Sequence, residues 1–317
     1  RAARIPRAAA GNDECAGALP RRRGDPAWGG GADGSPFREA RGRGDLHGPN
    51  FNLDVPADGY AWWYVDGVSD CGTRAISVIA FIGSVFSPWY KWSGRRRPDN
   101  HVCINVVTYG PGGRFTMTDR GVSALRQTND TFEVGPSKLT WDDGRLVIDV
   151  DELASPPLPG RVKGRITLTP SGVTRVEAPL MPDGSHVWRP FAPTAQIDVD
   201  LNRGWTWSGH GYFDANFGTR ALETDFSYWA WGRFPVAGGA ACFYGAERRG
   251  GGRLELGGKF TETGEIEPME IPRKTKFART AWAVRRETRA DPGYRPKQVK
   301  AMLDAPFYNR ASVRTQI

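Results

Sequence analysis

From residue 51 onward, the chain is a succession of short runs rich in β-branched and aromatic residues, separated by turn sequences at a spacing of about ten residues. The turns include GPGG at residues 110–113, DDG at 142–144 and PSG at 170–172. Glycine supplies the positive φ that such turns need, and aspartate tolerates it. This pattern predicts an all-β fold of barrel or sandwich architecture with little helix.

The expected strands fall into two sets with a proline-rich segment between them. They lie at residues 61–66, 75–82, 101–109, 115–119, 138–141, 146–150 and 162–169, and then at 196–201, 205–209, 226–234, 241–247, 254–259 and 280–287. Residues 178–193 contain four prolines, so we expect a domain boundary there. The predicted units are a β-domain over residues 51–190 and a second over 191–317, with one short helix at 296–303.

The first 50 residues have a different composition. They contain ten glycines and nine arginines but few aromatic residues, so this segment cannot bury enough apolar surface to fold. We therefore expect residues 1–50 to be a disordered, low-complexity segment. Its two Arg-Gly-Asp triplets, at 23–25 and 43–45, follow from that composition, and an adhesion role is the weakest interpretation. Because the chain begins with Arg1 instead of Met, we expect a truncated or mis-started copy.

The formal net charge of +8 suggests nucleic acid or a membrane surface as a partner. The bases are concentrated at the ends, however. Residues 1–50 carry +3 and residues 273–317 carry +9, which leaves −4 for residues 51–272. No helix-turn-helix or RNP-like pattern accompanies these bases, so we expect no nucleic-acid partner.

Several common catalytic and ligand-binding patterns are missing from the sequence. It has no Walker loop, no GxGxxG between a strand and a helix, no HExxH and no GxSxG. The four histidines are scattered, and the four cysteines have no CxxC spacing, which indicates free thiols in a reducing compartment. The longest apolar run, residues 75–86, is too short to span a bilayer, and no secretory signal is visible. We expect no metal and no cofactor.

Five of the twelve tryptophans lie between residues 186 and 233, around one aspartate. Tyr212, Phe213 and Phe217 flank Asp214 and lower the local polarity. A desolvated carboxyl has a raised pKa, and a neutral acid beside an aromatic pocket can protonate an electron-rich substrate. The alternative is an ordinary turn, because Asp-x-Asn-x-Gly is also turn chemistry.

Trp229 and Trp231 alternate with period two, so they point to the same face of one strand. Aromatic faces stabilise a cation, and an enzyme that makes a carbocation would use such a lining. These rings can equally form core, and the residues alone leave both interpretations open.

Several long aromatic-rich motifs resemble those of the carotenoid 1,2-hydratases, also called hydroxyneurosporene synthases. They are residues 81–121, HVWRPFAP at 186–193, GHGYFDANFG at 209–218, YWAWGRF at 228–234 and LDAPFYNR at 303–310. The resemblance covers about residues 51–312. It implies two lipocalin-like β-domains and cofactor-independent addition of water to the terminal C1–C2 double bond of acyclic carotenes such as neurosporene and lycopene. That reaction belongs to spheroidene and spirilloxanthin biosynthesis in photosynthetic bacteria.

This resemblance implies roles for individual residues. Asp214 is expected to be the general acid, with Tyr212 orienting it or the water. Trp188, and then Trp229 and Trp231, are expected to stabilise the cation. His186 is expected to take the proton from the attacking water, with His210 as the alternative. Phe213 and Phe217 complete the predicted substrate-binding set, Trp229, Trp231, His210, Phe213 and Phe217.

Two other functions remain open at this point. A non-catalytic lipocalin-like carrier would keep the aromatic pocket without needing the acid, and a cyclase of related two-domain architecture would use the acid but exclude water. Because a polyene dissolves in bilayers, we expect a cytoplasmic protein in peripheral contact with the intracytoplasmic membrane. The basic residues at 273–276 and 285–300 are candidates for that contact.

Overall fold

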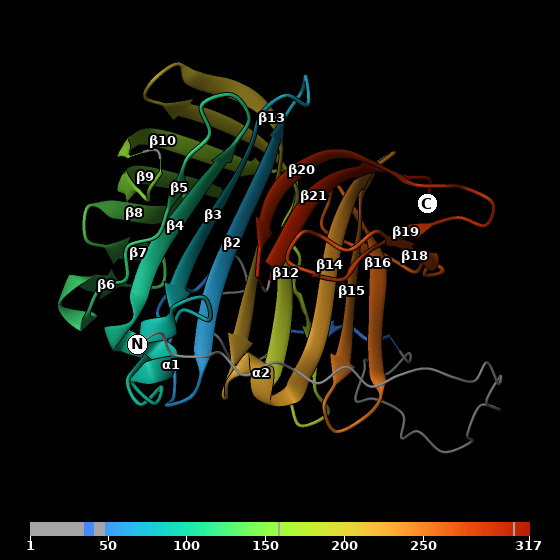
Figure 1. Cartoon of the computed structure of the whole chain (residues 1–317), viewed down its shortest axis with the longest axis horizontal. Coiled ribbons are helices and arrows are strands. Elements are labelled where there is room, and N and C mark those ends of the chain that lie inside the picture. Colours follow the sequence, from blue (N-terminus) through green and yellow to red (C-terminus); the bar gives the residue numbers. More distant parts are fainter. Residues whose placement is uncertain (1–34, 41–47, 158, 307) are drawn as a thin grey trace.

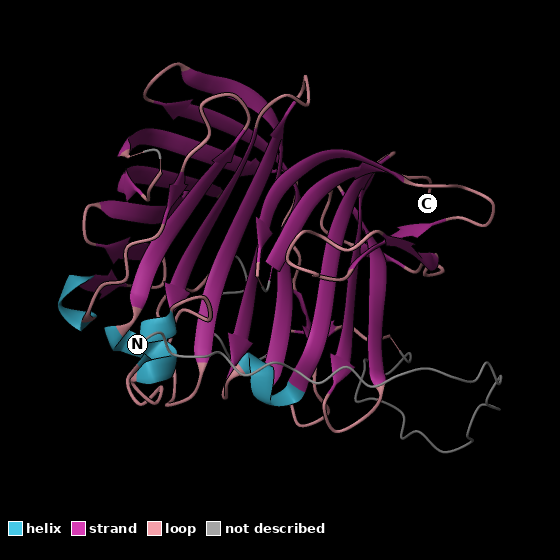
Figure 2. Ribbon diagram, in the orientation of Figure 1, coloured by secondary structure: helices cyan, strands magenta, loops and turns pink. Residues whose placement is uncertain are grey.

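The computed structural model describes residues 35–40 and 48–317 except 158 and 307. It is almost entirely built from antiparallel strands (Figures 1 and 2). The helices in this part of the chain are two short α-helices, α1 (Pro88–Trp92) and α2 (Leu222–Asp225), and the 3-10 turns Pro98–Asn100 and Val122–Ala124. The predicted all-β fold class with little helix is therefore confirmed.

The first large unit is a sheet that curls into a barrel. The ladder runs β12–β13–β2–β3–β4–β5–β9–β10 and returns to β12, because β10 pairs with both β9 and β12. These strands are β2 (Tyr60–Ser69), β3 (Ala75–Ile82), β4 (Val102–Tyr109), β5 (Phe115–Thr116), β9 (Arg145–Ala154), β10 (Gly160–Pro170), β12 (His186–Leu201) and β13 (Trp205–Gly218). The remaining strands of this sheet are β1 (Arg38–Glu39), β6 (Leu125–Gln127), β7 (Thr131–Val134), β8 (Ser137–Asp142) and β11 (Val176–Pro179).

A second, smaller sheet follows, and two hairpins come after it. The sheet has the order β14–β15–β16–β17, with β14 (Phe226–Val236), β15 (Gly239–Arg248), β16 (Arg253–Thr261) and β17 (Ile266–Glu267). The hairpins are β18 (Arg273–Phe277) with β19 (Arg286–Ala290), and β20 (Lys297–Ala305) with β21 (Tyr308–Arg314). Figure 1 shows β20 and β21 passing between the barrel strand β2 and strand β14.

Period-two alternation along β2, β12 and β13 gives the barrel wall two apolar faces. Trp63, Phe213 and Phe217 point inward to the barrel core, whereas Trp62, Trp188 and Tyr212 point outward. The outward set packs against Cys242, Tyr244 and Phe260 of the second sheet. Both faces of this wall are therefore buried, and a second apolar layer lies between the barrel and the smaller sheet.

Three sequence-based expectations differ from the structure. The helix expected at 296–303 is wrong, because these residues form β20, whose pairing with β21 outweighs local helix preference. Residues 35–40 and 48–50 are not disordered: Arg38–Glu39 pairs with β11, and Phe37 and Asn50 are buried. The rest of the segment 1–50, including both Arg-Gly-Asp triplets, lies outside the described residues.

The expected boundary at 190–191 falls inside strand β12. Register irregularities occur in β12 between Arg189 and Ala195, where Pro190 and Pro193 lie. Proline cannot donate to a ladder and is tolerated at bulges, so the proline-rich segment is a bulged strand. The change of sheet comes after Gly218, at α2. Whether the two sheets are separate folding domains stays a prediction.

Candidate active site

A cavity of about 1220 Å³ lies between the outer face of the barrel wall and the later strands. Its walls come from β2, β3 and β13 on one side and from β14 and the hairpin β20–β21 on the other. The cavity therefore lies between the two parts of the fold, outside the barrel core. Such a volume is in the range of, or above, typical small-molecule sites, so it can take a large ligand.

Asp214 lies on β13 and lines this cavity, although its side chain is only 3% exposed. Burial raises the pKa of Asp214 to about 7, against the lowering effect of hydrogen bonds from Tyr212 and Trp188. The hydroxyl of Tyr212 donates to Oδ2 at 2.7 Å, and the indole Nε1 of Trp188 donates to the same oxygen at 2.9 Å. Among the described residues, Oδ1 of Asp214 has no hydrogen-bond partner. The carboxyl is therefore held through one oxygen, and its other oxygen has no partner among the described residues.

Trp188 and Tyr212 are both fully buried and are not part of the cavity lining. Trp188 packs on Tyr244 and Phe260, with ring centroids 5.5 and 6.4 Å away. The structure thus brings Trp188, Tyr212 and Asp214 together as predicted, but it places the Trp188 ring behind the carboxyl. Its position fits an acid-holding donor better than a ring that faces a cation.

The rings that do face the cavity include Trp229 and Trp231, as expected from their alternation on β14. Trp229 stacks on Trp62 at 6.4 Å, and Trp231 lies against Tyr64 at 5.6 Å. Trp62 and Tyr64 come from β2 and also line the cavity. Sequence reasoning missed both, although the same period-two alternation in AWWYVD (61–66) places them on one face.

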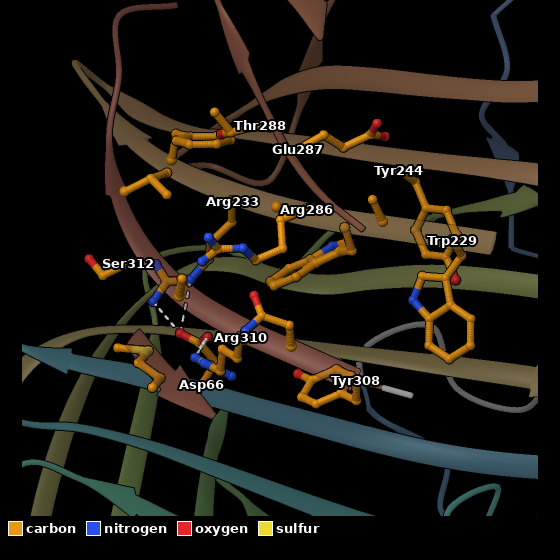
Figure 3. A pocket seen from close by; sticks show the side chains of 18 of the residues that line it. Asp66, Trp229, Arg233, Tyr244, Arg286, Glu287, Thr288, Tyr308, Arg310 and Ser312 are labelled. Atoms are coloured by element: carbon orange, nitrogen blue, oxygen red, sulfur yellow. Dashed lines mark hydrogen bonds and ion pairs between the residues drawn. The ribbon is translucent and has the colours of Figure 1, made fainter. Parts of the chain in front are cut away.

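A charged cluster lies on the other side of the cavity from Trp229 and Tyr244 (Figure 3). Oδ1 of Asp66 accepts from Nη2 of Arg233 at 2.6 Å, and Oδ2 accepts from Arg310 and from the hydroxyl of Tyr64 at 3.0 Å. Burial acts to raise the pKa of Asp66, but the two guanidinium groups outweigh it and hold this pKa well below its usual value. Asp66 is therefore an ionised, fully paired carboxylate, unlike Asp214.

His210 lines the cavity beside this cluster. Its Nδ1 lies 3.1 Å from Nη1 of Arg233. Because arginine can only donate, Nδ1 must accept, and the ring is neutral with its proton on Nε2. Burial and the charge of Arg233 both lower the pKa of His210. These contacts tie His210 to the charged cluster instead of to Asp214.

His186 is fully buried and is not among the residues that line the cavity. Its Nδ1 lies 2.8 Å from the hydroxyl of Tyr60, and its Nε2 lies 2.8 Å from Oδ2 of Asp225. Burial lowers the pKa of His186 despite the adjacent carboxylate. Both ring nitrogens are engaged, so this position does not support the predicted transfer of a proton from water to His186. The histidine instead connects β12 to β2 and α2.

Phe213 and Phe217 point away from the cavity. Phe213 packs against Phe191 at 5.4 Å and Phe217 against Trp63 at 6.2 Å, inside the barrel core. On a strand, odd and even positions face opposite sides, so neither can share the face of Asp214. The expectation that they bind substrate does not fit these positions.

On β13 and β14, three buried polar atoms belong to cavity-lining residues and have no hydrogen-bond partner in the described part of the chain. They are Oδ1 of Asp214, Oδ1 of Asn216 and Nε1 of Trp231. Buried polar atoms almost always have a partner, which is often an ordered water. Asn216 and Asp214 are two residues apart on β13, about 7 Å along one strand face. The sequence analysis did not single out Asn216.

The described residues contain neither a metal-ligand cluster nor a helix that could cross a membrane. No group of three or more His, Cys, Asp or Glu lies together in a way that could hold a metal ion. No helix within the same residues is long and apolar enough to cross a membrane.

Comparison with known proteins connects this site to a family. Residues 78–317, which span most of the chain, match the family model described as Carotenoid hydratase CrtC. The chain belongs to this family. The matched residues include β12 and β13, and with them the carboxyl of Asp214 and both of its donors. The resemblance noted in the sequence motifs is therefore confirmed.

Curated carotenoid hydratases are similar over most of their length. An acyclic carotenoid 1,2-hydratase of Cereibacter sphaeroides is 62% identical over 240 residues, covering 76% of this chain and 86% of that protein. The acyclic carotenoid 1,2-hydratase of Rhodobacter capsulatus is 59% identical over 241 residues, with the same coverage. That of Thiocapsa roseopersicina is 41% identical over 293 residues, covering 90% of this chain and 72% of that protein.

Among solved structures, the chain is similar to kievitone hydratase from Nectria haematococca, with a TM-score of 0.47 and 11% identity over 85% of this chain and 88% of that chain. It is also similar to CghA with Sch210972, with a TM-score of 0.47 and 10% identity over 86% of this chain and 89% of that chain. These likenesses are too remote to inform about the reaction.

Proposed function

We propose that this carotenoid hydratase is a hydro-lyase that adds water to the terminal C1–C2 double bond of acyclic carotenes and forms the tertiary 1-hydroxy product. The family membership and the acyclic carotenoid 1,2-hydratases among its relatives support the reaction. One observation carries the mechanism: Asp214 lines an aromatic cavity, and its buried carboxyl has one oxygen held by two donors and the other without a partner among the described residues.

The first step is proton transfer to carbon. With its pKa raised to about 7 by burial, Asp214 is about half neutral at pH 7 and largely neutral below it, so it can serve as a general acid. The π electrons of the double bond form the new C2–H bond, and the positive charge develops at C1, which carries more alkyl groups. The faces of Trp62, Trp229 and Trp231 stabilise a cation in this desolvated space. Trp188 and Tyr212 position the acid and stabilise the carboxylate that the step leaves behind.

The second step is capture of the cation by water. Oδ1 of Asn216 and Nε1 of Trp231 are buried polar atoms of cavity-lining residues without a partner among the described residues, and we assign them to holding this water. The water oxygen forms the C1–O bond, and its extra proton returns to the carboxylate of Asp214. The acid is regenerated, and neither a metal nor an oxidant takes part in the balance.

Product analysis with lycopene tests the proposal. The purified chain is incubated with detergent-dispersed lycopene in H₂¹⁸O. The pigments are then separated by chromatography, and their masses are measured by mass spectrometry. A 1-hydroxy product that carries ¹⁸O is expected, and Asp214→Asn should abolish it while binding persists. Bound but unchanged pigment would instead identify a carrier, and an isomeric product without oxygen would identify a cyclase. Hydration by Asp214→Asn at the wild-type rate would overturn the acid assignment.

We also propose that the hydratase works in peripheral contact with a membrane on the cytoplasmic side. The support is chemical: an acyclic carotene partitions into lipid, so the enzyme must collect it there. Release of the chain from isolated membranes by carbonate wash, followed by activity in the released fraction, is the expected result. Retention after that wash would contradict peripheral association.

A further inference from the structure

Helix α1 presents two tryptophans to solvent. The side chains of Trp89 and Trp92 are 60% and 70% exposed, and their ring centroids lie 5.0 Å apart in an edge-to-face arrangement. Residues three apart share one helix face, so the pair forms a single projecting aromatic ridge. Tryptophan is enriched where proteins meet the membrane–water interface, because its large ring is apolar and its indole N–H remains hydrated.

The opposite side of α1 is fixed to the barrel. Tyr90 is buried, and its hydroxyl donates to the carbonyl of Gly59 at 2.6 Å. At the start of the helix, the amide of Tyr90 donates to Oγ of Ser87 at 3.3 Å. The helix therefore holds its tryptophans outward on a rigid base, and they are not side chains that could fold back onto the core.

Basic residues accompany the two rings. Lys91 and Arg96 are exposed and form no ion pair within the described residues, whereas Arg97 is paired with Asp99. Acidic residues also lie nearby: the amide of Asp58 donates to the carbonyl of Arg95, and Asp119 accepts from the cap residue Ser87. Exposed bases next to interfacial aromatics are the combination that binds anionic lipid surfaces.

This surface lies at one end of the cavity. Val85 and Phe86, which directly precede the cap of α1, line the cavity, and so does Glu223 of α2. Arg95, directly after the helix, forms an ion pair with Glu223. Figure 1 shows α1 and α2 at the same end of the strands. A bilayer against α1 would therefore face the end of the cavity that is lined by aromatic rings.

Three basic residues between 273 and 300 are less suited to this role. Lys274 is paired with Glu255 and Glu287, and Arg285 with Glu247. Arg289 is mostly buried and also paired with Glu255. These three bases are neutralised inside the fold, whereas the other seven bases of the segment 273–300 form no ion pair among the described residues.

We propose that Trp89, Trp92, Lys91 and Arg96 form a docking surface for an anionic lipid bilayer and place the adjoining end of the cavity against it. The purpose of docking, uptake of an apolar polyene, rests on the proposed function. The binding itself does not, because it is a property of α1 and can be measured without substrate.

Co-sedimentation with vesicles tests the surface. One set of vesicles is phosphatidylcholine, and the other is an equal mixture of phosphatidylcholine and phosphatidylglycerol. Trp89→Ala with Trp92→Ala should lower the partition coefficient for the mixed vesicles at least about tenfold, and Lys91→Gln with Arg96→Gln about twentyfold or more, near fivefold per base. Trp282→Ala, which removes an equally exposed ring at 58%, is the matched control and should bind like the wild type.

Two outcomes separate this proposal from the hydratase assignment. Hydration of detergent-dispersed lycopene should be unchanged in the α1 variants, whereas hydration of lycopene supplied in vesicles should fall with binding. Vesicle binding that is identical in the wild type and both double variants overturns the docking surface and leaves the hydratase function intact. A chain that binds vesicles through α1 but never hydrates lycopene would overturn only the function.

Discussion

Trp188 and Asp214 lie on neighbouring strands of the barrel wall, and the indole N–H of Trp188 donates to Oδ2 of Asp214 at 2.9 Å. Because Tyr212 donates to the same oxygen, both hydrogen bonds fix one side of the carboxyl and leave Oδ1 without a partner among the described residues. The two bonds favour the charged form, yet burial prevails and the pKa of Asp214 is raised to about 7. Burial thus keeps Asp214 neutral before proton transfer, and the two hydrogen bonds stabilise its carboxylate afterwards.

The pH profile of hydration should follow this carboxyl. Asp214 is neutral below a pKa of about 7, so kcat/KM should be flat at lower pH and fall about tenfold per pH unit above it. Initial rates with detergent-dispersed lycopene, measured in buffers of constant ionic strength, give this curve. A rate that rises through neutral pH would mean that the ionised form is the active one.

Trp188→Phe should shift the pH profile of hydration to higher pH. Loss of the N–H removes one interaction that lowers the pKa of Asp214, so the alkaline limb should shift to higher pH. The ring that packs on Tyr244 and Phe260 is mostly retained, which limits the loss of stability. Trp188→Ala is the comparison, because it removes the donor and the packing together. An unshifted alkaline limb in Trp188→Phe would show that the indole N–H does not tune the acid.

Asp214→Asn should stabilise the folded chain at alkaline pH. The folded-state pKa of Asp214 is raised from 3.8 to about 7, so the group's contribution to stability is fully present below about pH 4 and is lost as pH rises to 7. Asparagine cannot ionise and escapes this loss, which corresponds to roughly 4 kcal/mol. Urea unfolding at about pH 8 should show the variant as the more stable protein, and at about pH 4 the difference should vanish. Equal stability at both pH values would contradict a neutral Asp214.

Asn216→Leu should separate protonation from capture by water. In D₂O, the variant should still transfer a deuteron to C2, but without its water ligand the cation should return to starting material. We expect recovered lycopene to carry deuterium while 1-hydroxy product falls about tenfold to a hundredfold. Mass spectra of both pigments give the two quantities. Loss of product without deuterium uptake would assign Asn216 to the acid step or to folding.

Arg310→Met should destabilise the fold through Asp66. The variant leaves a buried carboxylate with Arg233 alone, and breaking a buried ion pair costs about 3 kcal/mol. Urea unfolding at neutral pH measures the change. Lys259→Met is the control, since its ion pair with Glu267 lies near the surface and should change stability little. Similar small effects in both variants would show that the charged cluster adds nothing to the fold.

The sequence predicted the parts of the site that lie close together along the chain. Tyr212 and Asp214 are two residues apart on one strand, so their shared face follows from period two alone. Trp188 joins them because β12 and β13 are adjacent in the sequence and form a hairpin. The same periodicity argues against substrate contact by Phe213 and Phe217, and it could have identified Trp62 and Tyr64 on β2.

The other parts of the site depend on packing between strands that are distant in the sequence. Asp66, Arg233 and Arg310 come from β2, β14 and β21, and no local pattern indicates that these strands meet. The hydrogen-bond partners of His186, Tyr60 and Asp225, are also distant in the sequence. These contacts hold the histidine ring away from the cavity. Pairing between β20 and β21 also decides that residues 297–305 form a strand instead of a helix.

The hairpin β20–β21 forms one wall of the cavity and also supplies a partner to a buried charge. Arg310 on β21 neutralises a carboxylate that lies on β2, near the other end of the described chain. If the hairpin moved away from β2, Asp66 would lose one of its two guanidinium partners while still buried. Small partial openings are therefore unfavourable, and we expect the hairpin to open as one cooperative unit. Amide hydrogens of β20 and β21 should accordingly exchange together, through one opening equilibrium that breaks the ion pair between Arg310 and Asp66.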